Sequence, residues 1–342
     1  MDKRTEISDL GEFGLIDLIA SKFPENIQDS TEKGIGDDAA VINHKEKTVI
    51  SSDLLLEGVH FDLGYMPIQH LGYKSVAVNV SDIASMNAIP TQITINLGLS
   101  NRISLEAVEA LYEGVKAACK NFKVDLVGGD TSTSTSGLVI SVTAIGEVEE
   151  ENIAYRSKAK DKDIICVTGD LGAAYLGLQV LEREKQVFLT NPEMQPKLEG
   201  YDYIIQRLLK PEARLDIIHE LRDQNIVPTS MIDVSDGLAS DLMHIAKQSG
   251  LGARIYEDKL PIDQLTYTTA VEFNLDPITC VLNGGEDYEL LFTIDQKDFE
   301  KLEKHPDIHF IGYMEKGSEI GLVTKNEQWV PLQAQGWNHF KD

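Results

Sequence analysis

The sequence GIGDDAAV occupies residues 34–41 and opens the part of the chain that decides its fold. An apolar segment that we predict to be a strand follows, and it leads into SSD at residues 51–53 and EGVHF at residues 57–61. Carboxylates that are held close together repel each other, and the repulsion grows as water is excluded. Oxygen ligands without a nearby His–Cys pairing favour Mg²⁺ over zinc. The stretch therefore predicts a Mg²⁺-dependent enzyme of phosphoryl transfer.

The composition is that of a globular protein with a strong negative charge. The chain has 342 residues, of which 42% are hydrophobic and 25% charged. This length favours two domains. The formal net charge is 31 − 56 = −25, so nucleic acid and anionic membrane surfaces are excluded as expected partners.

The cysteines and the N-terminus point to a reducing compartment. Cys119, Cys166 and Cys280 lie far apart and form no C-x-x-C pair, so we expect them to be small core residues. The first ten residues are charged, and no run approaches the ~18 apolar residues of a membrane span. We therefore expect a cytoplasmic protein.

The first half of the chain predicts strands mixed with helices. Strands are expected over residues 47–53, 92–99, 124–127 and 138–145, and helices over 12–23, 71–86 and 105–122. Residues 92–99 alternate apolar and polar side chains, which is typical of a strand with one buried face. The helix over 71–86 is rich in small residues and should pack closely against another element. This half is expected to be α+β or layered α/β.

The charged run EVEEEN at residues 147–152 is the best boundary between domains, dividing the chain into 1–150 and 151–342. Beyond it we expect a helix from Ala173 to Leu181 and a polar surface excursion over residues 182–200. The other expected strands lie near 163–168, 229–233, 253–256, 279–282, 290–294 and 309–311, and the other helices start near Ser240, Pro261 and Gln296.

Acidic residues follow several of these expected strands. An isolated Asp pair or a single Asp is more often a turn or cap residue. Here, however, acids are expected at the exits of at least four strands, where α/β sheets bind ligands. They are found in the motifs GDD (36–38), SSD (51–53), SD (81–82), GGD (128–130) and DVSDG (233–237). The combination favours a shared site over independent caps.

The usual nucleotide-binding motifs do not occur. The chain has no G-x-x-x-x-G-K-[ST], no G-x-G-x-x-G and no H-R-D or D-F-G. Phosphates would then be held by metal bridged to Asp, by backbone N–H groups and by isolated cations such as Arg156 or Lys74. A Ser-His-Asp triad and H-E-x-x-H are also absent.

The combined motifs resemble the thiamine-monophosphate kinase family. The resemblance runs from Gly11 to about Phe340 and includes GVHF (58–61), AVNVSDIA (77–84), RS (156–157), TG (168–169) and GGEDYEL (284–290) in addition to the motifs above. The same superfamily contains aminoimidazole ribonucleotide synthetase, selenophosphate synthetase and a hydrogenase-maturation protein.

The resemblance implies a two-domain α/β protein with an aminoimidazole ribonucleotide synthetase-like fold. It implies an N-terminal domain with a mixed sheet and helices, which binds ATP and metal and forms a homodimer, and a C-terminal α/β domain that completes the nucleotide and substrate site. The implied reaction is ATP + thiamine monophosphate → ADP + thiamine diphosphate, the last step of coenzyme synthesis.

The resemblance also assigns residues. The implied ligands of several Mg²⁺ ions are Asp38, Ser51, Ser52, Asp53, Asp82, Asp130, Asp233 and Asp236. The implied contacts to ATP are Gly129, Asp130, Arg156 and Ser235, and those to the thiamine portion are His60, Glu286 and Trp337. Asp37 is not assigned as a direct ligand. The family often has Thr within the 51–53 motif, Gly where Asn87 stands and Tyr where Trp337 stands.

The acceptor explains why no general base is evident. A phosphate monoester is already anionic at neutral pH, so direct in-line transfer needs charge neutralisation and alignment rather than proton removal. Asp53 and Asp130 are the residues on which we expect turnover to depend most. Alternatives are another ATP-dependent enzyme of the superfamily, resembling aminoimidazole ribonucleotide synthetase or selenophosphate synthetase, or a non-catalytic Mg²⁺- or nucleotide-binding module.

Overall fold

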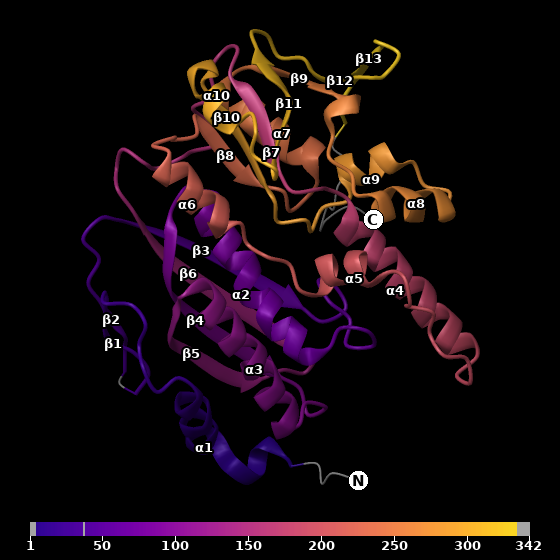
Figure 1. Cartoon of the computed structure of the whole chain (residues 1–342). Coiled ribbons are helices and arrows are strands. Elements are labelled where there is room, and N and C mark those ends of the chain that lie inside the picture. Colours follow the sequence, from indigo (N-terminus) through magenta and orange to yellow (C-terminus); the bar gives the residue numbers. More distant parts are fainter. Residues whose placement is uncertain (1–4, 37, 334–342) are drawn as a thin grey trace. The chain divides into compact units, whose positions relative to one another are not determined.

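The computed structural model describes residues 5–36 and 38–333. The chain forms two compact units. The first comprises residues 1–83 and 88–151, and the second comprises residues 84–87 and 152–342. Helices and mixed sheets occur in both, as the sequence predicts (Figure 1).

The first unit is built on a four-stranded sheet with the strand order β3-β6-β4-β5. The β4–β5 pair is parallel, and the β3–β6 and β4–β6 pairs are antiparallel. The elements of this unit are α1 (Ile7–Lys22), β1 (Thr31–Lys33), β2 (Val41–Ile42), β3 (Lys47–Leu56), α2 (Ile68–Ala84), β4 (Ile89–Leu99), α3 (Leu105–Phe122), β5 (Asp125–Thr133) and β6 (Val139–Val148).

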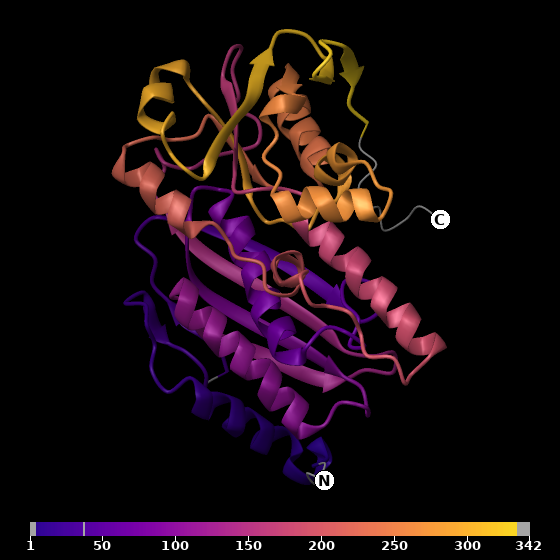
Figure 2. The same ribbon diagram turned by 45° about the vertical axis from the view of Figure 1, so that its right-hand side comes forward.

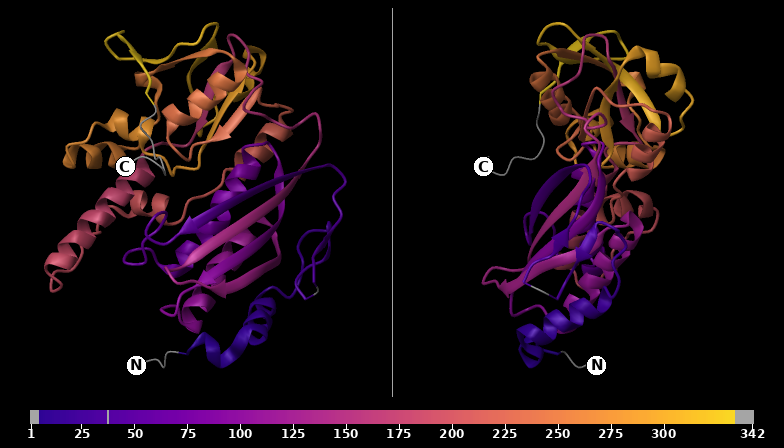
Figure 3. Two further views of the ribbon diagram at one scale, coloured as in Figure 1. Left: turned by 180° about the vertical axis from the view of Figure 1, so that it is seen from behind. Right: turned by 90° about the vertical axis from the view of Figure 1, so that its left-hand side faces the viewer.

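Helices α2 and α3 cover one face of this sheet, as Figures 2 and 3 show. Strand β6 alternates strictly: Ile140, Val142 and Ala144 are buried, whereas Ser141 and Thr143 are only half-buried. Side chains of successive strand residues point to opposite faces, so the first set faces the helices. We call the other face, which carries Ser141 and Thr143, the open face.

Glycine lets α2 and α3 pack backbone to backbone. A Cβ on Gly114 of α3 would lie 1.8 Å from the carbonyl oxygen of Gln69, and one on Gly72 of α2 would lie 2.0 Å from that of Leu111. The close packing expected for the small-residue helix is therefore confirmed. The cap predicted for α3 is also present, since Ser104 Oγ accepts a hydrogen bond from Ala107 N (3.3 Å).

Strand β5 does not end at the two glycines, contrary to the prediction. It continues to Thr133, and Asp130 pairs with Asn96 of β4. A Cβ on Gly129 would lie 1.9 Å from the carbonyl oxygen of Ile95. The glycine pair therefore serves a close approach between two strands inside the sheet rather than a turn.

The second unit is built on a seven-stranded sheet with the order β13-β12-β9-β11-β7-β10-β8. All its strand pairs are antiparallel except β12–β9. Its strands are β7 (Ile164–Thr168), β8 (Ser230–Asp233), β9 (Gly252–Tyr256), β10 (Leu290–Ile294), β11 (Ile308–Glu315), β12 (Ile320–Val323) and β13 (Trp329–Pro331). Its α-helices are α4 (Ala173–Thr190), α5 (Asp202–Leu209), α6 (Leu215–Asp223), α7 (Leu238–Ser249), α8 (Gln264–Glu272), α9 (Pro277–Asn283) and α10 (Phe299–Leu302).

Two predictions for the second unit were wrong. The expected surface excursion begins only after Thr190, because α4 continues to that residue. The expected strand near 279–282 is part of α9. Pro277 stands in the first turn of α9, and the Asp276 carboxylate accepts hydrogen bonds from Ile278 N and Thr279 N, so a capped helix start overrides the β-branched residues.

The structure also tests two further expectations, that the cysteines are core residues and that no helix spans a membrane. Cys119, Cys166 and Cys280 are free and buried, which confirms them as core residues. Within the described part of the chain, no helix is both long and apolar enough to cross a membrane.

The α2–α3 contact predicts a specific sensitivity. We expect Gly114→Ala to lower the free energy of unfolding by roughly 1–3 kcal/mol, because the added methyl group must force two backbones apart. Lys116→Ala, at an exposed position on the same helix, should change it by less than about 0.5 kcal/mol. Chemical denaturation of both variants measures this, and equal stability of the two would contradict the packing described here.

Candidate active site

The first group of predicted site residues lies between β3 and α2. Ser51 and Asp53 are two residues apart on β3, so both side chains lie on its helix-covered side. Asn79 and Asp82 are three residues apart on α2, so they share one face of that helix. Ser51 Oγ donates a hydrogen bond to Asp82 Oδ2 (2.5 Å), and the Asp53 backbone N–H donates one to Asn79 Oδ1 (3.0 Å). The structure therefore brings Ser51, Asp53 and Asp82 together. Asn79 belongs to this group but was not among the predicted site residues.

The surroundings of the Asp53 carboxyl disfavour its ionised form. Burial, together with the charge of Asp82, raises the pKa of the Asp53 carboxyl to about 6. All donors here are oxygen atoms. Such a group favours a hard cation.

Ser52 and Asp130 lie on the other face. Asp53 is in register with Val142 of β6, whereas Asp130 is in register with Asn96, which pairs with Ser141. Ser52 Oγ contacts Thr143 Oγ1 (3.0 Å) and donates to the carbonyl of Val142 (3.1 Å). Ser52 and Asp130 are thus placed on the open face, away from the Asp53 side chain.

Asp53 and Asp130 also stand on opposite edges of the sheet. Strands β6 and β4 separate β3 from β5, and three interstrand spacings amount to about 14 Å. An Mg²⁺ ligand lies about 2 Å from the ion. Within this unit, therefore, the two carboxylates do not share one ion.

Asp130 lines a large cavity together with two other predicted residues. The cavity has a volume of about 1420 Å³, and Asp38, Gly129 and Asp130 contribute to its wall. The hydroxyl-rich segment 131–135 continues this polar side, and apolar residues of α1 form part of the opposite side. This is the second place in the first unit where predicted site residues meet.

His60 follows β3 in a tight turn. Its Nδ1 accepts a hydrogen bond from the Leu56 backbone N–H (3.0 Å), and the ring is half-buried. In the neutral ring the proton is then on Nε2.

A third group lies in the second unit, at the end of β8 and the start of α7. Asp233 and Asp241 are each 2% exposed, and Asp241 Oδ2 accepts a hydrogen bond from the Asp236 backbone N–H (3.3 Å). Burial, with the charges of Asp233 and Asp236, raises the pKa of Asp241 to about 8. The charge of Arg156 opposes this shift, so Arg156 lies near the same carboxylates.

Asp241 was missed by the sequence reasoning. The available signal was an acid in the first turn of the helix that follows DVSDG, where α7 begins at Leu238. The sequence analysis predicts a helix that starts near Ser240 but assigns no role to the acid in its first turn. Of the predicted acids, Asp233 does end a strand, but Asp53 and Asp130 lie inside strands and Asp82 lies in a helix.

Glu286 lies beside this third group. Its backbone N–H donates to the carbonyl of Ser235 (2.8 Å), and its Oε1 accepts a hydrogen bond from the hydroxyl of Tyr288 (3.2 Å). The structure therefore brings Ser235 and Glu286 together. Asp37 and Trp337 lie outside the described residues. Over residues 5–36 and 38–333, no group of three or more His, Cys, Asp or Glu side chains is arranged to hold a metal ion.

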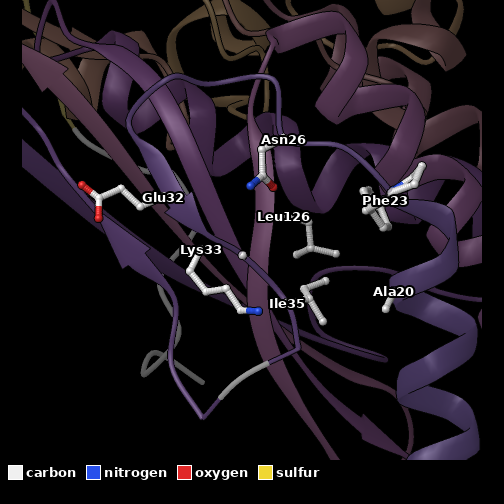
Figure 4. A pocket seen from close by; sticks show the side chains of 9 residues that line it. Ala20, Phe23, Asn26, Glu32, Lys33, Ile35 and Leu126 are labelled. Carbon is white, nitrogen blue, oxygen red and sulfur yellow. The ribbon is translucent and has the colours of Figure 1, made fainter.

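A smaller cavity in the first unit is not part of the site. It has a volume of about 240 Å³ and is lined by Phe23, Asn26, Lys33, Ile35 and Leu126 among others (Figure 4). None of the predicted site residues contributes to it.

Comparisons with known proteins identify the family of this chain. Residues 36–148 match the family of AIR synthase related proteins, N-terminal domain, and residues 161–325 match the C-terminal domain of the same family. Thiamine-monophosphate kinase of Bacillus subtilis is 36% identical over 335 residues, covering 95% of this chain and 99% of the relative. That of Escherichia coli is 34% identical, covering 96% and 98%.

Solved structures give the same result. Thiamine-monophosphate kinase of Stenotrophomonas maltophilia has a TM-score of 0.78 at 33% identity, covering 92% of this chain and 96% of that one. AaThiL complexed with AMPPCP and TMP has a TM-score of 0.75 at 34% identity, covering 98% and 99%. The hydrogenase maturation protein HypE in complex with ATP, at 18% identity and a TM-score of 0.75, shares the fold. The two-domain α/β fold is thus confirmed, and the chain belongs to the thiamine-monophosphate kinase family of AIR synthase related proteins.

Proposed function

We propose that this protein transfers the γ-phosphate of ATP to thiamine monophosphate, giving thiamine diphosphate and ADP. The observation that carries the proposal is near-full-length similarity to thiamine-monophosphate kinases. It is joined by groups of predicted site residues that the fold assembles in each unit. AaThiL binds AMPPCP and TMP, which supports the same pair of ligands for this chain. A cytoplasmic location remains a prediction.

We propose Mg²⁺ as the metal. The donor set fits, since Ser51, Asp53 and Asp82 offer only side-chain oxygen atoms, Ser51 is hydrogen-bonded to Asp82, and the charge of Asp82 acts on Asp53. The pKa of Asp53 is raised first by burial and then by the charge of Asp82, and a bound cation would offset both effects. When bound, Mg²⁺ supplies charge neutralisation to the phosphates. Asp38 and Asp130 at the large cavity, and Asp233 and Asp236 in the second unit, complete the proposed set, with Ser52 on the open face.

The remaining residues act on the two substrates. Gly129 exposes its backbone to the cavity, where a phosphate can approach closely, and Arg156 and Ser235 complete the proposed ATP contacts. His60 offers its Nε2 proton and Glu286 its carboxylate to the thiamine portion, and Trp337 is proposed as a third contact. No residue is assigned to remove a proton, because the acceptor phosphate is already ionised at neutral pH. These residues bind and align the two anions for in-line transfer without a phosphoenzyme.

We further propose a homodimer formed through the open face of the first unit's sheet. Ile50 and Leu54 of β3 are exposed on this face by 64% and 51%. Apolar side chains this exposed on one sheet face favour a partner. A second copy is also the simplest way to bring Asp130 on β5 of one chain to the β3 edge of the other, since β3 and β5 lie on opposite edges of a single unit's sheet.

The assignment predicts a large loss of turnover without a loss of fold. Asp53→Asn and Asp130→Asn should each lower kcat at least 100-fold, because each removes a charge that the transfer depends on. Asp223→Asn, at an exposed position in α6, should leave kcat within twofold. ADP release coupled to NADH oxidation, with thiamine monophosphate and a panel of other acceptors, measures this. Full turnover of either site variant, or in excess chelator, would count against the proposal.

The pKa of Asp53 predicts a stability that depends on pH. The folded-state pKa of about 6 exceeds the ordinary 3.8, so the folded protein binds more protons and loses stability as the pH rises from 4 through 6. The loss is at most about 3 kcal/mol. In EDTA, Asp53→Asn should therefore be more stable than wild type at pH 8 and about equal to it at pH 4. A wild-type advantage at pH 8 in thermal unfolding would contradict this.

A shared site predicts complementation between inactive variants. If Asp53 and Asp130 come from different chains, a mixed dimer of the Asp53→Asn and Asp130→Asn proteins contains one intact site. Co-refolding equal amounts should then restore about a quarter of wild-type activity. No recovery, with mixed dimers verified by mass spectrometry, would show that each chain supplies both residues to its own site.

A further inference from the structure

Two non-glycine residues of segment 284–289, Glu286 and Tyr288, hold a backbone conformation that such residues disfavour. The φ angles of Gly285, Glu286 and Tyr288 are 71°, 61° and 53°. Residues other than glycine rarely adopt this left-handed region, since Cβ crowds the carbonyl oxygen. Such backbone persists only where its surroundings hold it. Contacts with the rest of the second unit must therefore hold this loop in place.

One anchor is the carboxylate of Glu289, which is 1% exposed. It accepts hydrogen bonds from Thr168 Oγ1 (2.6 Å), Arg207 Nη1 (2.8 Å) and Arg214 Nη1 (2.7 Å). It also fills the space in which a Cβ on Gly169 would lie, 2.4 Å from Glu289 Oε1. The end of the loop is thus fixed by two arginines and by the turn after β7.

Arg207 extends this anchor into the loop itself. Its Nη2 donates to the carbonyl of Asp287 (3.3 Å) and to the carbonyl of Asp170 (3.1 Å). The Asp287 carboxylate in turn accepts hydrogen bonds from the backbone N–H groups of Gly172 (2.8 Å) and Ala174 (3.5 Å). One guanidinium on α5 therefore connects the loop to the turn that starts α4.

The residues between these anchors are Glu286 and Tyr288. Asp287 and Glu289 are each 1% exposed, whereas Glu286 is half-buried. The Glu286 and Tyr288 backbone N–H groups donate to the carbonyls of Ser235 (2.8 Å) and Val234 (2.9 Å). The backbone N–H groups of Glu286 and Tyr288 thus hold the loop to the DVSDG motif, whereas Asp287 and Glu289 hold it to the arginines and to the start of α4.

We propose that Arg207 is a positioning residue for substrate binding: through Glu289 and the Asp287 carbonyl it sets the conformation that presents Glu286 to the substrate. This inference rests on the proposed function, in which Glu286 contacts the thiamine portion. A planar guanidinium can hold a carboxylate and carbonyls of separate segments at once, whereas an ammonium cannot match that geometry.

The test is a comparison of Michaelis constants. Arg207→Lys keeps the charge but loses the fork, so KM for thiamine monophosphate should rise at least tenfold while KM for ATP stays within twofold. Arg183→Lys is the matched control, because Arg183 also holds two carboxylates, those of Glu184 and Glu272, elsewhere in the same unit. It should leave both constants unchanged.

The double variant separates positioning from simple stabilisation. If Arg207 acts through Glu286, Arg207→Lys should raise KM no further in a Glu286→Gln background. Multiplied effects, or a fall in active fraction with both Michaelis constants unchanged, would overturn the inference. Where Arg207→Lys does not fold, Glu289→Gln provides the same comparison.

A second readout does not depend on catalysis. Hydrogen exchange of the Tyr288 amide should accelerate at least tenfold in Arg207→Lys and not in Arg183→Lys. If wild type forms no ADP from thiamine monophosphate, the proposed function fails, and the exchange experiment still decides whether Arg207 orders the loop. Unchanged exchange would refute that role.

Discussion

Repulsion between carboxylates that the fold holds together is the constraint on which this structure depends. Asp53 faces Asp82 in the first unit, and Asp241 faces Asp233 and Asp236 in the second, and the pKa values of Asp53 and Asp241 are raised for the same two reasons, burial and neighbouring charge. The free energy that keeps these groups close must come from elsewhere in the fold. It comes from packing, since the strand and helices that carry them belong to continuous sheets and buried helix faces.

The packing of α2 shows how an ordinary structural feature serves the site. The glycine contact with α3 lets two helices lie side by side at backbone distance on one face of the sheet. Helix α2 can then run along β3 closely enough for Asn79 to accept the Asp53 N–H and for Asp82 to accept the Ser51 hydroxyl. Larger side chains where α2 meets α3 would shift α2, and with it the side-chain oxygen atoms of Asn79 and Asp82.

Local sequence predicted most elements, because periodicity and caps are local properties. The alternation over residues 92–99 and the Ser104 cap are present as expected. The fold class followed from the mixture of both element types. The local sequence did not predict the faces of the sheet on which Asp53 and Asp130 lie, because these faces depend on the register of β3 with β6 and of β4 with β5. Register joins residues that are far apart in the chain, and no short motif encodes it. Asp241 was missed for a related reason, because its burial comes from packing.

The fold treats the charges of its buried carboxylates in two different ways. Glu289 is as buried as Asp233, yet two arginines neutralise it completely within the fold. Asp53 instead faces another carboxylate, and its pKa moves toward the neutral form. In a chain with 31 basic and 56 acidic residues, basic side chains are scarce, yet two of them contact Glu289 at the end of segment 284–289, and one of these, Arg214, also pairs with Asp216 and Asp307. A carboxylate that the fold neutralises can only support structure, whereas one whose charge it leaves unbalanced retains the capacity to bind a cation.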